Sequence, residues 1–451
     1  MAEAPGRFGG ETIFALASGQ GRAGVAVLRV SGPRAREAVE ALAGVVAEPR
    51  RAVLRTLRDP TSGEALDRAL VLRFCAPASY TGEEAAELHV HGGRAVIAAV
   101  ADALLRAAPG VRPAEAGEFT RRAFLNGKLD LTAAEGVADL VAAETAAQRR
   151  QALAQVDGRL AHCVAGWVER LTHALALAEA AIDFADDGVG EQAEAEALGD
   201  AAAVAAEMGA ALVGAGRAER VRDGVRVAII GAPNAGKSSL LNRLAGRDAA
   251  IVSARAGTTR DVIEVRMDLG GQAVTLADTA GLRQTEDDIE AEGVRRALAW
   301  AGEAELRLAV FDGLSLGPDA GTVAALSQGG RRWIGVATRC DLGRRLGTVL
   351  GEEVTSVSSV TGAGLDAVLA ALTDAVGALA GETSGAVLTR ARHRAAVEEA
   401  VAAISRAGDA GLPELRAEAL RGALRAIGRL TGRVDVEDLL DVVFRSFCIG
   451  K

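Results

Sequence analysis

The sequence predicts a multidomain protein of mixed α+β and α/β class, in which a doubly wound nucleotide-binding domain is inserted into a helical bundle. Three observations predict this class. A glycine-rich loop follows an apolar run at residues 225–230, strand-like and helix-like segments then alternate to about residue 380, and alanine-rich helical stretches lie on both sides. The length of 451 residues also exceeds what one hydrophobic core usually holds.

The N-terminal part, residues 1–125, mixes strand-like runs with one clear helix. Apolar runs predict strands over 24–30, 65–74 and 85–90, and apolar residues at helical spacing predict a helix over 93–106. Such a mixture is typical of a small α+β domain.

Two helical regions flank the inserted domain. Residues 126–221 contain no proline and carry apolar residues and charges at helical spacing, and the same alanine-rich pattern returns over 383–451. We therefore expect the two regions to be halves of one helical domain.

The inserted domain, residues 222–382, alternates strands with helices. The pair Gly270-Gly271 between two strand-like runs is a hairpin signal. The alternation predicts a mostly parallel sheet with helices on both faces. Strands are expected over 225–230, 262–269, 272–277, 306–311, 333–337 and 354–357.

The glycine-rich loop has the Gly-x4-Gly-Lys-Ser spacing of a phosphate-binding loop. Gly231 and Gly236 let the backbone curl, so that successive N–H groups point at the phosphates. Lys237 reaches the β- and γ-phosphate oxygens, Ser238 coordinates Mg2+, and the following helix N-terminus favours negative charge. The residues expected around the nucleotide are Asn234, Ala235, Gly236, Lys237, Ser238 and Ser239.

Two motifs downstream complete the phosphate side of the site. Gly257-Thr258-Thr259-Arg260-Asp261 offers a threonine hydroxyl, Thr259, to Mg2+. Asp278-Thr279-Ala280-Gly281 follows a strand, where Asp278 can hold a Mg2+-bound water and the Gly281 N–H can sense the γ-phosphate.

Two further motifs suit a guanine base. Asp341, in Thr338-Arg339-Cys340-Asp341, can accept hydrogen bonds from guanine N1 and N2, and a backbone N–H at Ser358-Ser359 can meet O6. Each motif alone is weak. The five together, in this order, predict a Ras-like P-loop GTPase domain that uses GTP and Mg2+.

The residue after Gly281 is Leu282, where many signalling GTPases carry the glutamine that orients the attacking water. The acidic stretch 286–290 lies close downstream and can supply a carboxylate instead. An acidic helix start, favoured by the helix dipole, explains the same residues equally well.

Composition narrows the setting. Apolar residues make up 49% of the chain and charged residues 25%, as in ordinary globular proteins, and no long uncharged apolar run or signal segment is visible. Four scattered cysteines form no Cys-x-x-Cys pair, which argues against zinc and a disulfide framework. We expect a cytoplasmic protein without a membrane partner. With a net charge of −9, any nucleic acid must be met by a local basic patch.

Several phrases distributed along the chain carry a family resemblance. They are TIFALA (12–17), VLRVSG (27–32), SYTGE (79–83), HVHGG (89–93), GEFTRRAFLNGKLDL (117–131), AAIDF (180–184) and FCIGK (447–451). Over essentially its full length the chain resembles the bacterial tRNA-modification GTPase family MnmE, also called TrmE. The resemblance implies addition of a carboxymethylaminomethyl group to the wobble uridine of certain tRNAs. It also implies a homodimer that joins the flavoprotein MnmG (GidA) in a heterotetramer.

The resemblance implies a folate site as well. Family members bind 5-formyltetrahydrofolate or a related tetrahydrofolate in the N-terminal domain, which also dimerises. The matching positions are Arg29, Glu87, Lys128 and the terminal Lys451. Cations suit the folate glutamate, and a carboxylate suits the amino-pyrimidine edge of the pterin. Without the family, Arg29 and Glu87 would be interpreted as ordinary strand residues.

The resemblance further implies hydrolysis through G-domain dimerisation, with K+ taking the place of an arginine finger. Asn234 matches the K+ ligand, and Glu290 matches the glutamate that positions the attacking water. A role for Cys448 in the tRNA chemistry is a further possibility, but this thiol can equally be a packing residue. The loop expected to assist at K+ and the nucleotide is Ser253, Ala254, Arg255, Ala256, Gly257 and Thr258.

Two motifs depart from the family pattern. Thr338-Arg339-Cys340-Asp341 stands where Asn-Lys-x-Asp is usual, and Ser358-Ser359-Val360 replaces Ser-Ala-Lys or Ser-Ala-Arg. These departures put nucleotide affinity in question, not the class. Two other functions stay open: an RNA-associated regulatory GTPase such as a ribosome-assembly switch, and a folate-dependent aminomethyl transferase that carries a GTPase.

Overall fold

The structure is a computed structural model, and its chain divides into two compact units. Unit 1 comprises residues 1–138, 156–168 and 424–451, and unit 2 comprises residues 139–155 and 169–423. The structure describes residues 10–19, 21–45, 48–183, 189–247, 249–251, 264–278, 302, 304–315, 317–327, 332–343, 346–381, 387–432, 440, 443–444, 447 and 450.

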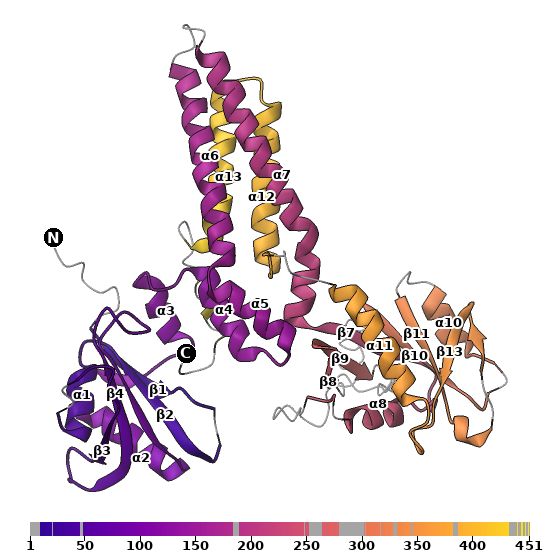
Figure 1. Cartoon of the computed structure of the whole chain (residues 1–451), viewed down its shortest axis with the longest axis horizontal. Helices are drawn as coiled ribbons and strands as arrows, with labels where there is room; N and C mark the ends of the chain where they lie inside the picture. The colour runs from indigo at the N-terminus through magenta and orange to yellow at the C-terminus, as the bar shows by residue number, and fades with distance from the viewer. Residues whose placement is uncertain are drawn as a thin grey trace, which may run out of the picture. The chain divides into compact units, whose positions relative to one another are not determined.

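Unit 1 contains a six-stranded sheet in the order β3-β4-β5-β2-β1-β6 (Figure 1). Neighbouring strands are antiparallel except for the parallel pair β1–β6. The strands are β1 Thr12–Leu16, β2 Ala23–Ser31, β3 Val53–Arg58, β4 Ala65–Phe74, β5 Ala85–Gly92 and β6 Val111–Pro113. The α+β class predicted for this region is confirmed, and so are the three strands predicted from the sequence.

Helices α1 (Ala35–Ala43) and α2 (Arg94–Ala107) cover one face of this sheet. Alternate strand residues, such as Leu28 on β2 and Leu88 on β5, are buried in the core that these helices complete. Because side chains alternate across a strand, the residues between them face away from the helices. The sequence predicted one helix here and missed α1, although its buried residues Ala35, Ala38, Val39, Leu42 and Ala43 recur at helical spacing.

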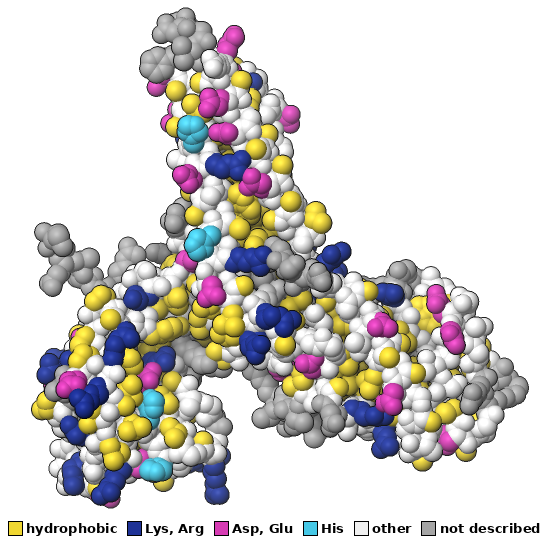
Figure 2. Space-filling model, viewed as in Figure 1, with side chains coloured by type: hydrophobic (Ala, Val, Ile, Leu, Met, Phe, Trp, Pro, Cys, Tyr) yellow, Lys and Arg dark blue, Asp and Glu magenta, His cyan; other side chains and the backbone are white. Residues whose placement is uncertain are grey.

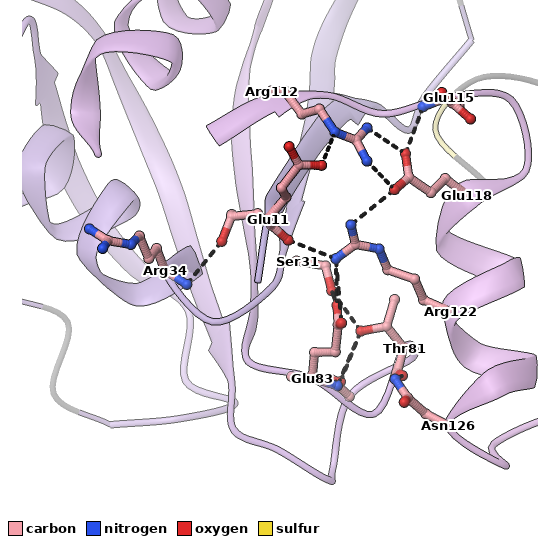
Figure 3. Close-up of polar contacts among 12 residues, drawn as sticks. Glu11, Ser31, Arg34, Thr81, Glu83, Arg112, Glu115, Glu118, Arg122 and Asn126 are labelled. Atoms are coloured by element: carbon pink, nitrogen blue, oxygen red, sulfur yellow. Dashed lines mark hydrogen bonds and ion pairs between the residues drawn. The ribbon is translucent and has the colours of Figure 1, made fainter. Parts of the chain in front are cut away.

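Helix α3 (Glu118–Leu125) is joined to the strands by a buried ionic network (Figure 3). Arg122, with 1% of its side chain exposed, donates to Glu118 Oε1 at 2.9 Å, to Glu83 Oε2 at 3.2 Å and to the Glu11 carbonyl at 3.0 Å. Arg112 approaches Glu118 from the other side with two hydrogen bonds of 2.8 Å.

The network also sets the ionisation of Glu118. Burial raises the pKa of Glu118, but hydrogen bonds from Arg112, the Glu115 N–H and Arg122 together lower that pKa below its ordinary value. Glu118 therefore remains a carboxylate in the buried network.

The C-terminal segment of the chain packs on α3 and on β1. Phe444 and Phe447 share a buried cluster with Leu131. At Gly117 a Cβ would lie 2.5 Å from the Phe444 carbonyl oxygen, and at Gly450 it would lie 2.2 Å from the Leu16 carbonyl oxygen. The backbone of the tail therefore approaches β1 more closely than a side chain would allow.

Among the described residues, six helices lie in the two regions that the sequence predicts to be helical. Helices α7 and α12 pack on each other, and Ala201, Val204 and Met208 are buried on α7 and Val397 and Ala400 on α12. The helices are α4 Leu131–Ala142, α5 Ala146–Val156, α6 Arg159–Asp183, α7 Val189–Asp223, α12 Ala391–Asp409 and α13 Pro413–Thr431.

Within the described residues, one helix has the length and hydropathy of a membrane span, Gly190–Asp223 with a mean hydropathy of 1.3. Its buried side chains recur at spacings of three, four or seven residues, at Ala201, Val204, Met208, Ala215 and Ala218. This single stripe is the pattern of a bundle helix, and the alanine content accounts for the hydropathy.

Unit 2 also contains the seven-stranded sheet of the inserted domain, in the order β12-β13-β11-β10-β7-β9-β8. Strand pairs are parallel except β8–β9 and β12–β13, so the predicted mostly parallel sheet is confirmed. The strands are β7 Val225–Ile230, β8 Glu264–Leu269, β9 Gln272–Asp278, β10 Leu306–Asp312, β11 Arg332–Thr338, β12 Thr348–Val349 and β13 Glu352–Ser356.

Helices cover both faces of this sheet, as predicted. Helices α8 (Lys237–Ala245) and α11 (Leu365–Ala380) pack on one face, and α10 (Ala320–Ser327) packs on the other. The hairpin β8–β9 turns at Gly270 and Gly271, whose φ angles of 63° and 84° suit glycine.

Candidate functional site

The loop between β7 and α8 has the backbone that its glycines predict. At Gly231 a Cβ would lie 2.2 Å from the Val310 carbonyl oxygen, so only glycine fits beside β10. Asn234 and Gly236 have φ angles of 62° and 91°, and Gly236 directly precedes α8. The loop therefore curls and turns its N–H groups toward the start of the helix.

The two polar side chains that open α8 lie against the loop and against β9. Lys237 Nζ donates to the Gly231 carbonyl at 2.9 Å and to the Ala232 carbonyl at 2.6 Å. Ser238 Oγ donates to Asp278 Oδ2 at 2.7 Å. The structure thus brings together Ser238 and Asp278, the two described residues predicted to serve Mg2+, from positions forty residues apart.

Lys237 is nearly buried, and burial lowers the pKa of its ammonium group, while the nearby carboxylates of Asp278 and Asp319 oppose this shift. A desolvated ammonium group beside carbonyl oxygens is ready to exchange these weak partners for phosphate oxygens.

The motif 338–341, which is predicted to recognise guanine and begins at the last residue of β11, is hydrogen-bonded to the phosphate loop. The Thr338 hydroxyl, which is buried, lies 2.7 Å from the Ala235 carbonyl and 3.2 Å from the Phe311 carbonyl. Arg339, with a φ of 61°, donates to Asp312 at 2.8 Å and to the Asn234 carbonyl at 2.9 Å. Thr338 and Arg339, which stand where the family has Asn-Lys, therefore connect this motif to the phosphate loop.

The second base-side motif lies beside the first. The Cys340 N–H donates to the Val357 carbonyl at 3.1 Å, which brings the turn containing Asp341 next to Ser358 and Ser359. Ser358 is fully buried, and its Oγ accepts from the N–H groups of Val360 and Thr361. Ser358 therefore shapes its own loop.

Several predicted site residues lie outside the described residues. They are Ser253, Ala254, Arg255, Ala256, Gly257, Thr258, Thr259, Thr279, Ala280, Gly281, Glu290, Cys448 and Lys451.

A second group of predicted residues lies on the sheet of unit 1, on the face that α1 and α2 leave uncovered. Arg29 on β2 and Glu87 on β5 are directly opposite in register, and the guanidinium contacts Glu87 Oε1 at 3.1 and 3.2 Å. Both side chains are only partly buried, with 25% and 21% exposed. Lys128 donates instead to the Pro77 carbonyl at 3.0 Å, in the loop between β4 and β5.

Three further residues were missed by sequence reasoning. His89 Nε2 lies 3.3 Å from Glu87 Oε2, and the guanidinium carbon of Arg29 lies 5.3 Å from the Tyr80 ring centroid and 5.9 Å from that of Phe119. The alternation of β5 places His89 on the face of Glu87, but no local signal indicates that Tyr80 or Phe119 reaches Arg29.

The fold and the loop geometry define a P-loop nucleotide-binding protein. Family models match most of the chain: the MnmE helical domain over residues 131–448 and the GTP-binding protein TrmE N-terminus over residues 12–128. The chain belongs to the MnmE family of tRNA modification GTPases, and it is a GTPase.

Three curated relatives carry the name tRNA modification GTPase MnmE. The protein of Rhodospirillum rubrum is 54% identical, with 98% of this chain and 99% of the relative covered. Those of Paramagnetospirillum magneticum and Caulobacter vibrioides are 55% and 52% identical, each with 98% of this chain and 100% of the relative covered. A solved G domain of the T. maritima FeoB iron transporter matches 35% of this chain and 99% of its own, with 28% identity and a TM-score of 0.27.

Proposed function

We propose that the chain hydrolyses GTP to drive modification of the wobble uridine of certain tRNAs. GTP hydrolysis is supported by the geometry of residues 231–238. Gly231 packs against β10 where only glycine fits, and the loop then curls into the start of α8. Family membership carries the tRNA half.

The residues around the loop fit GTP and Mg2+. The phosphates would lie on the N–H groups of the loop, where Lys237 neutralises negative charge. A hydroxyl and a carboxylate in contact, Ser238 and Asp278, are hard oxygen donors of the kind Mg2+ takes. Bound Mg2+ supplies charge neutralisation at the β- and γ-phosphates, and Thr259 and the Gly281 N–H would complete this side. On the base side, the carboxylate of Asp341 would read guanine.

K+ is proposed as a second cation at the same loop. Asn234 is exposed and held in a left-handed conformation, with its carbonyl fixed by Arg339, so its side-chain oxygen is free to face the phosphates. K+ there would supply positive charge between the β- and γ-phosphates. Oxygens of Ser253, Arg255 and Thr258 are proposed to assist, and Glu290 to orient the attacking water.

A tetrahydrofolate site is proposed on the sheet of unit 1. The fit is chemical: Arg29 and Glu87 form a partly exposed ion pair, which offers a cation and a carboxylate to one ligand. Lys128 and Lys451 are proposed as further cations for the folate glutamate. Gly450 packs on Leu16, the neighbour of Ala15, and Ala15 pairs with Arg29 across β1 and β2. The C-terminal segment therefore lies close to the strand that carries Arg29.

The remaining proposals concern assembly and setting. The chain would dimerise through its N-terminal domain, bind tRNA, join the flavoprotein MnmG and act in the cytoplasm. We propose domain boundaries at 1–125, 126–221, 222–382 and 383–451, with the first and last helical regions forming one domain around the G domain. Cys448 is proposed to serve the tRNA chemistry.

The test is the GTP hydrolysis rate of the purified chain in KCl and in NaCl at equal ionic strength. Strong stimulation by K+ but not Na+ is expected, because the cation must fit the Asn234 site rather than merely screen charge. An Asn234→Ala variant should lose the difference between the two salts. A low rate that ignores the cation in the wild-type chain would contradict the K+ proposal.

A further inference from the structure

The proposed folate site contains an arginine, Arg29, whose guanidinium lies beside two aromatic rings, Tyr80 and Phe119. The two nitrogens of Arg29 that contact Glu87 both meet the same oxygen, Oε1. This contact leaves Glu87 Oε2 facing His89 at 3.3 Å and available to a ligand. The guanidinium carbon of Arg29 lies over the Tyr80 ring, at 5.3 Å from the ring centroid, within the range of a cation–π contact.

Tyr80 itself is fixed at its far end. Its hydroxyl lies 2.9 Å from Thr120 Oγ1 on α3, and Thr120 is fully buried. Burial raises the pKa of Tyr80, with the hydrogen bond to Thr120 and the charge of Arg29 opposing the shift. The ring is therefore a neutral phenol, anchored at its oxygen and offering one face to Arg29.

The loop that carries Tyr80 is held from the segment that follows α3. Asn126 Nδ2 donates to the Thr81 carbonyl at 2.7 Å, and Lys128 Nζ donates to the Pro77 carbonyl at 3.0 Å. At Gly82, which has a φ of 80°, a Cβ would lie 3.2 Å from carbons of Asn126 and Lys128. Tyr80 thus has little freedom to move away from Arg29.

We propose that Tyr80 is a positioning residue of the folate site, acting through Arg29. Thr120 orients the phenol, the ring face holds the guanidinium, and the guanidinium holds Glu87 so that its carboxylate faces the amino-pyrimidine edge of a reduced folate. The inference rests on the proposed folate function and adds a specific residue to it. A cation–π contact that is partly desolvated supports a change in affinity of about 3- to 30-fold.

The experiment measures binding of 5-formyltetrahydrofolate to the full chain by calorimetry. Tyr80→Leu removes the ring and should weaken binding about 10-fold. Tyr80→Phe and Thr120→Val keep the aromatic ring but remove its hydrogen bond, and should weaken binding about 2- to 5-fold. Phe74→Leu is the matched control: it removes the ring 5.8 Å from Arg50, an arginine that does not contact Glu87, and should leave Kd unchanged. If Tyr80→Leu does not fold, the two conservative variants carry the test.

A double-mutant cycle separates positioning from general packing. If Tyr80 acts through Arg29, then Tyr80→Leu should weaken binding no further in a chain that already carries Arg29→Ala. Tyr80 is also the only tyrosine in the chain, so a tyrosine-labelled sample gives one ring signal by NMR, and this signal should shift when the folate is added.

The outcomes distinguish the two proposals. Absence of folate binding by the wild-type chain would overturn the folate part of the proposed function and the inference with it. Normal wild-type binding together with an unchanged Kd in Tyr80→Leu, or with fully additive effects in the cycle, would overturn the inference alone.

Discussion

At the residue scale, the motif 338–341 differs from the family pattern but is still hydrogen-bonded to the phosphate loop. Thr338 is buried and uses its hydroxyl on the Ala235 carbonyl, and Arg339 bridges Asp312 and Asn234 with separate nitrogens. Because these two residues hold the phosphate loop, Asp341 is the side chain of this motif that we propose to recognise the base.

Asp341→Asn should shift the nucleotide preference from GTP toward xanthosine triphosphate. The amide presents one donor and one acceptor where the carboxylate presents two acceptors. Xanthine offers the matching pair, an N1–H donor and a carbonyl acceptor at position 2 in place of the guanine amino group. Competition between the two triphosphates for the purified variant measures the shift. Retained GTP preference would mean that Asp341 does not contact the base.

Glu290→Ala should leave GTP binding intact while hydrolysis falls by roughly 10- to 1000-fold, because a group that orients the attacking water is lost. Glu286→Ala in the same acidic stretch is the matched control and should hydrolyse GTP at the wild-type rate. Single-turnover rates at saturating GTP measure both variants. Equal rates in the two variants would favour the alternative of an acidic helix start.

At the scale of elements, α3 is held to the sheet of unit 1 by a buried ionic network as well as by Phe119, which packs with Ile13 and Ala15 of β1. Arg122 is almost fully buried and contacts the Glu118 carboxylate within α3 and, from two other parts of the chain, the Glu83 carboxylate and the Glu11 carbonyl (Figure 3). The sequence offered two adjacent arginines, Arg121 and Arg122, without distinguishing the buried one. A buried arginine is tolerated because each of these partners compensates part of its desolvation.

Arg122→Met should destabilise unit 1 by about 3 kcal/mol, because it removes one partner of a buried ion pair and leaves Glu118 and Glu83 short of a donor. Arg112 contacts the same Glu118, but 33% of its side chain is exposed. Arg112→Met should therefore lower the stability of unit 1 by only about 1 kcal/mol. Hydrogen exchange of the α3 amides measures the local free energy of opening. Equal losses for the two variants would contradict the dominance of the buried pair.

At the scale of the whole molecule, the surface carries basic side chains mainly as scattered arginines, and many of those in Figure 2 lie over unit 1. The net charge of −9 does not attract tRNA as a whole, so a local basic surface has to do so. Hydrolysis through paired G domains, which the family resemblance implies, would also depend on more than one chain.

If K+ acts where two G domains pair, turnover per chain in KCl should fall once dilution separates the dimer into single chains, whereas the rate in NaCl should stay low at every concentration. Hydrolysis measured over a hundredfold range of concentration, with sedimentation in the same buffers to identify single chains and dimers, tests this expectation. An equal rate per chain in KCl for single chains and for dimers would contradict catalysis through a G-domain pair.

Much of the architecture could be predicted because its signals are local. The spacing of Gly231, Gly236, Lys237 and Ser238 determines a phosphate loop within eight residues, and Gly270-Gly271 determines a hairpin. The strand predicted over 65–74 coincides with β4, and that over 225–230 with β7. Short elements such as β1 and β3 were missed because five or six residues, without a strong alternation, carry too little pattern.

The sequence by itself therefore determined the class of protein, the nucleotide loop and, through its resemblance, the family. Only the tertiary structure decided which side chains meet. Arg29 and Glu87 are 58 residues apart and are opposed by the register of β2 and β5, and Thr338 reaches Ala235 across 103 residues. Register depends on burial of the whole sheet core, and the approach of Tyr80 to Arg29 depends on α3. Such distances are set by packing among many residues, which no local spacing encodes.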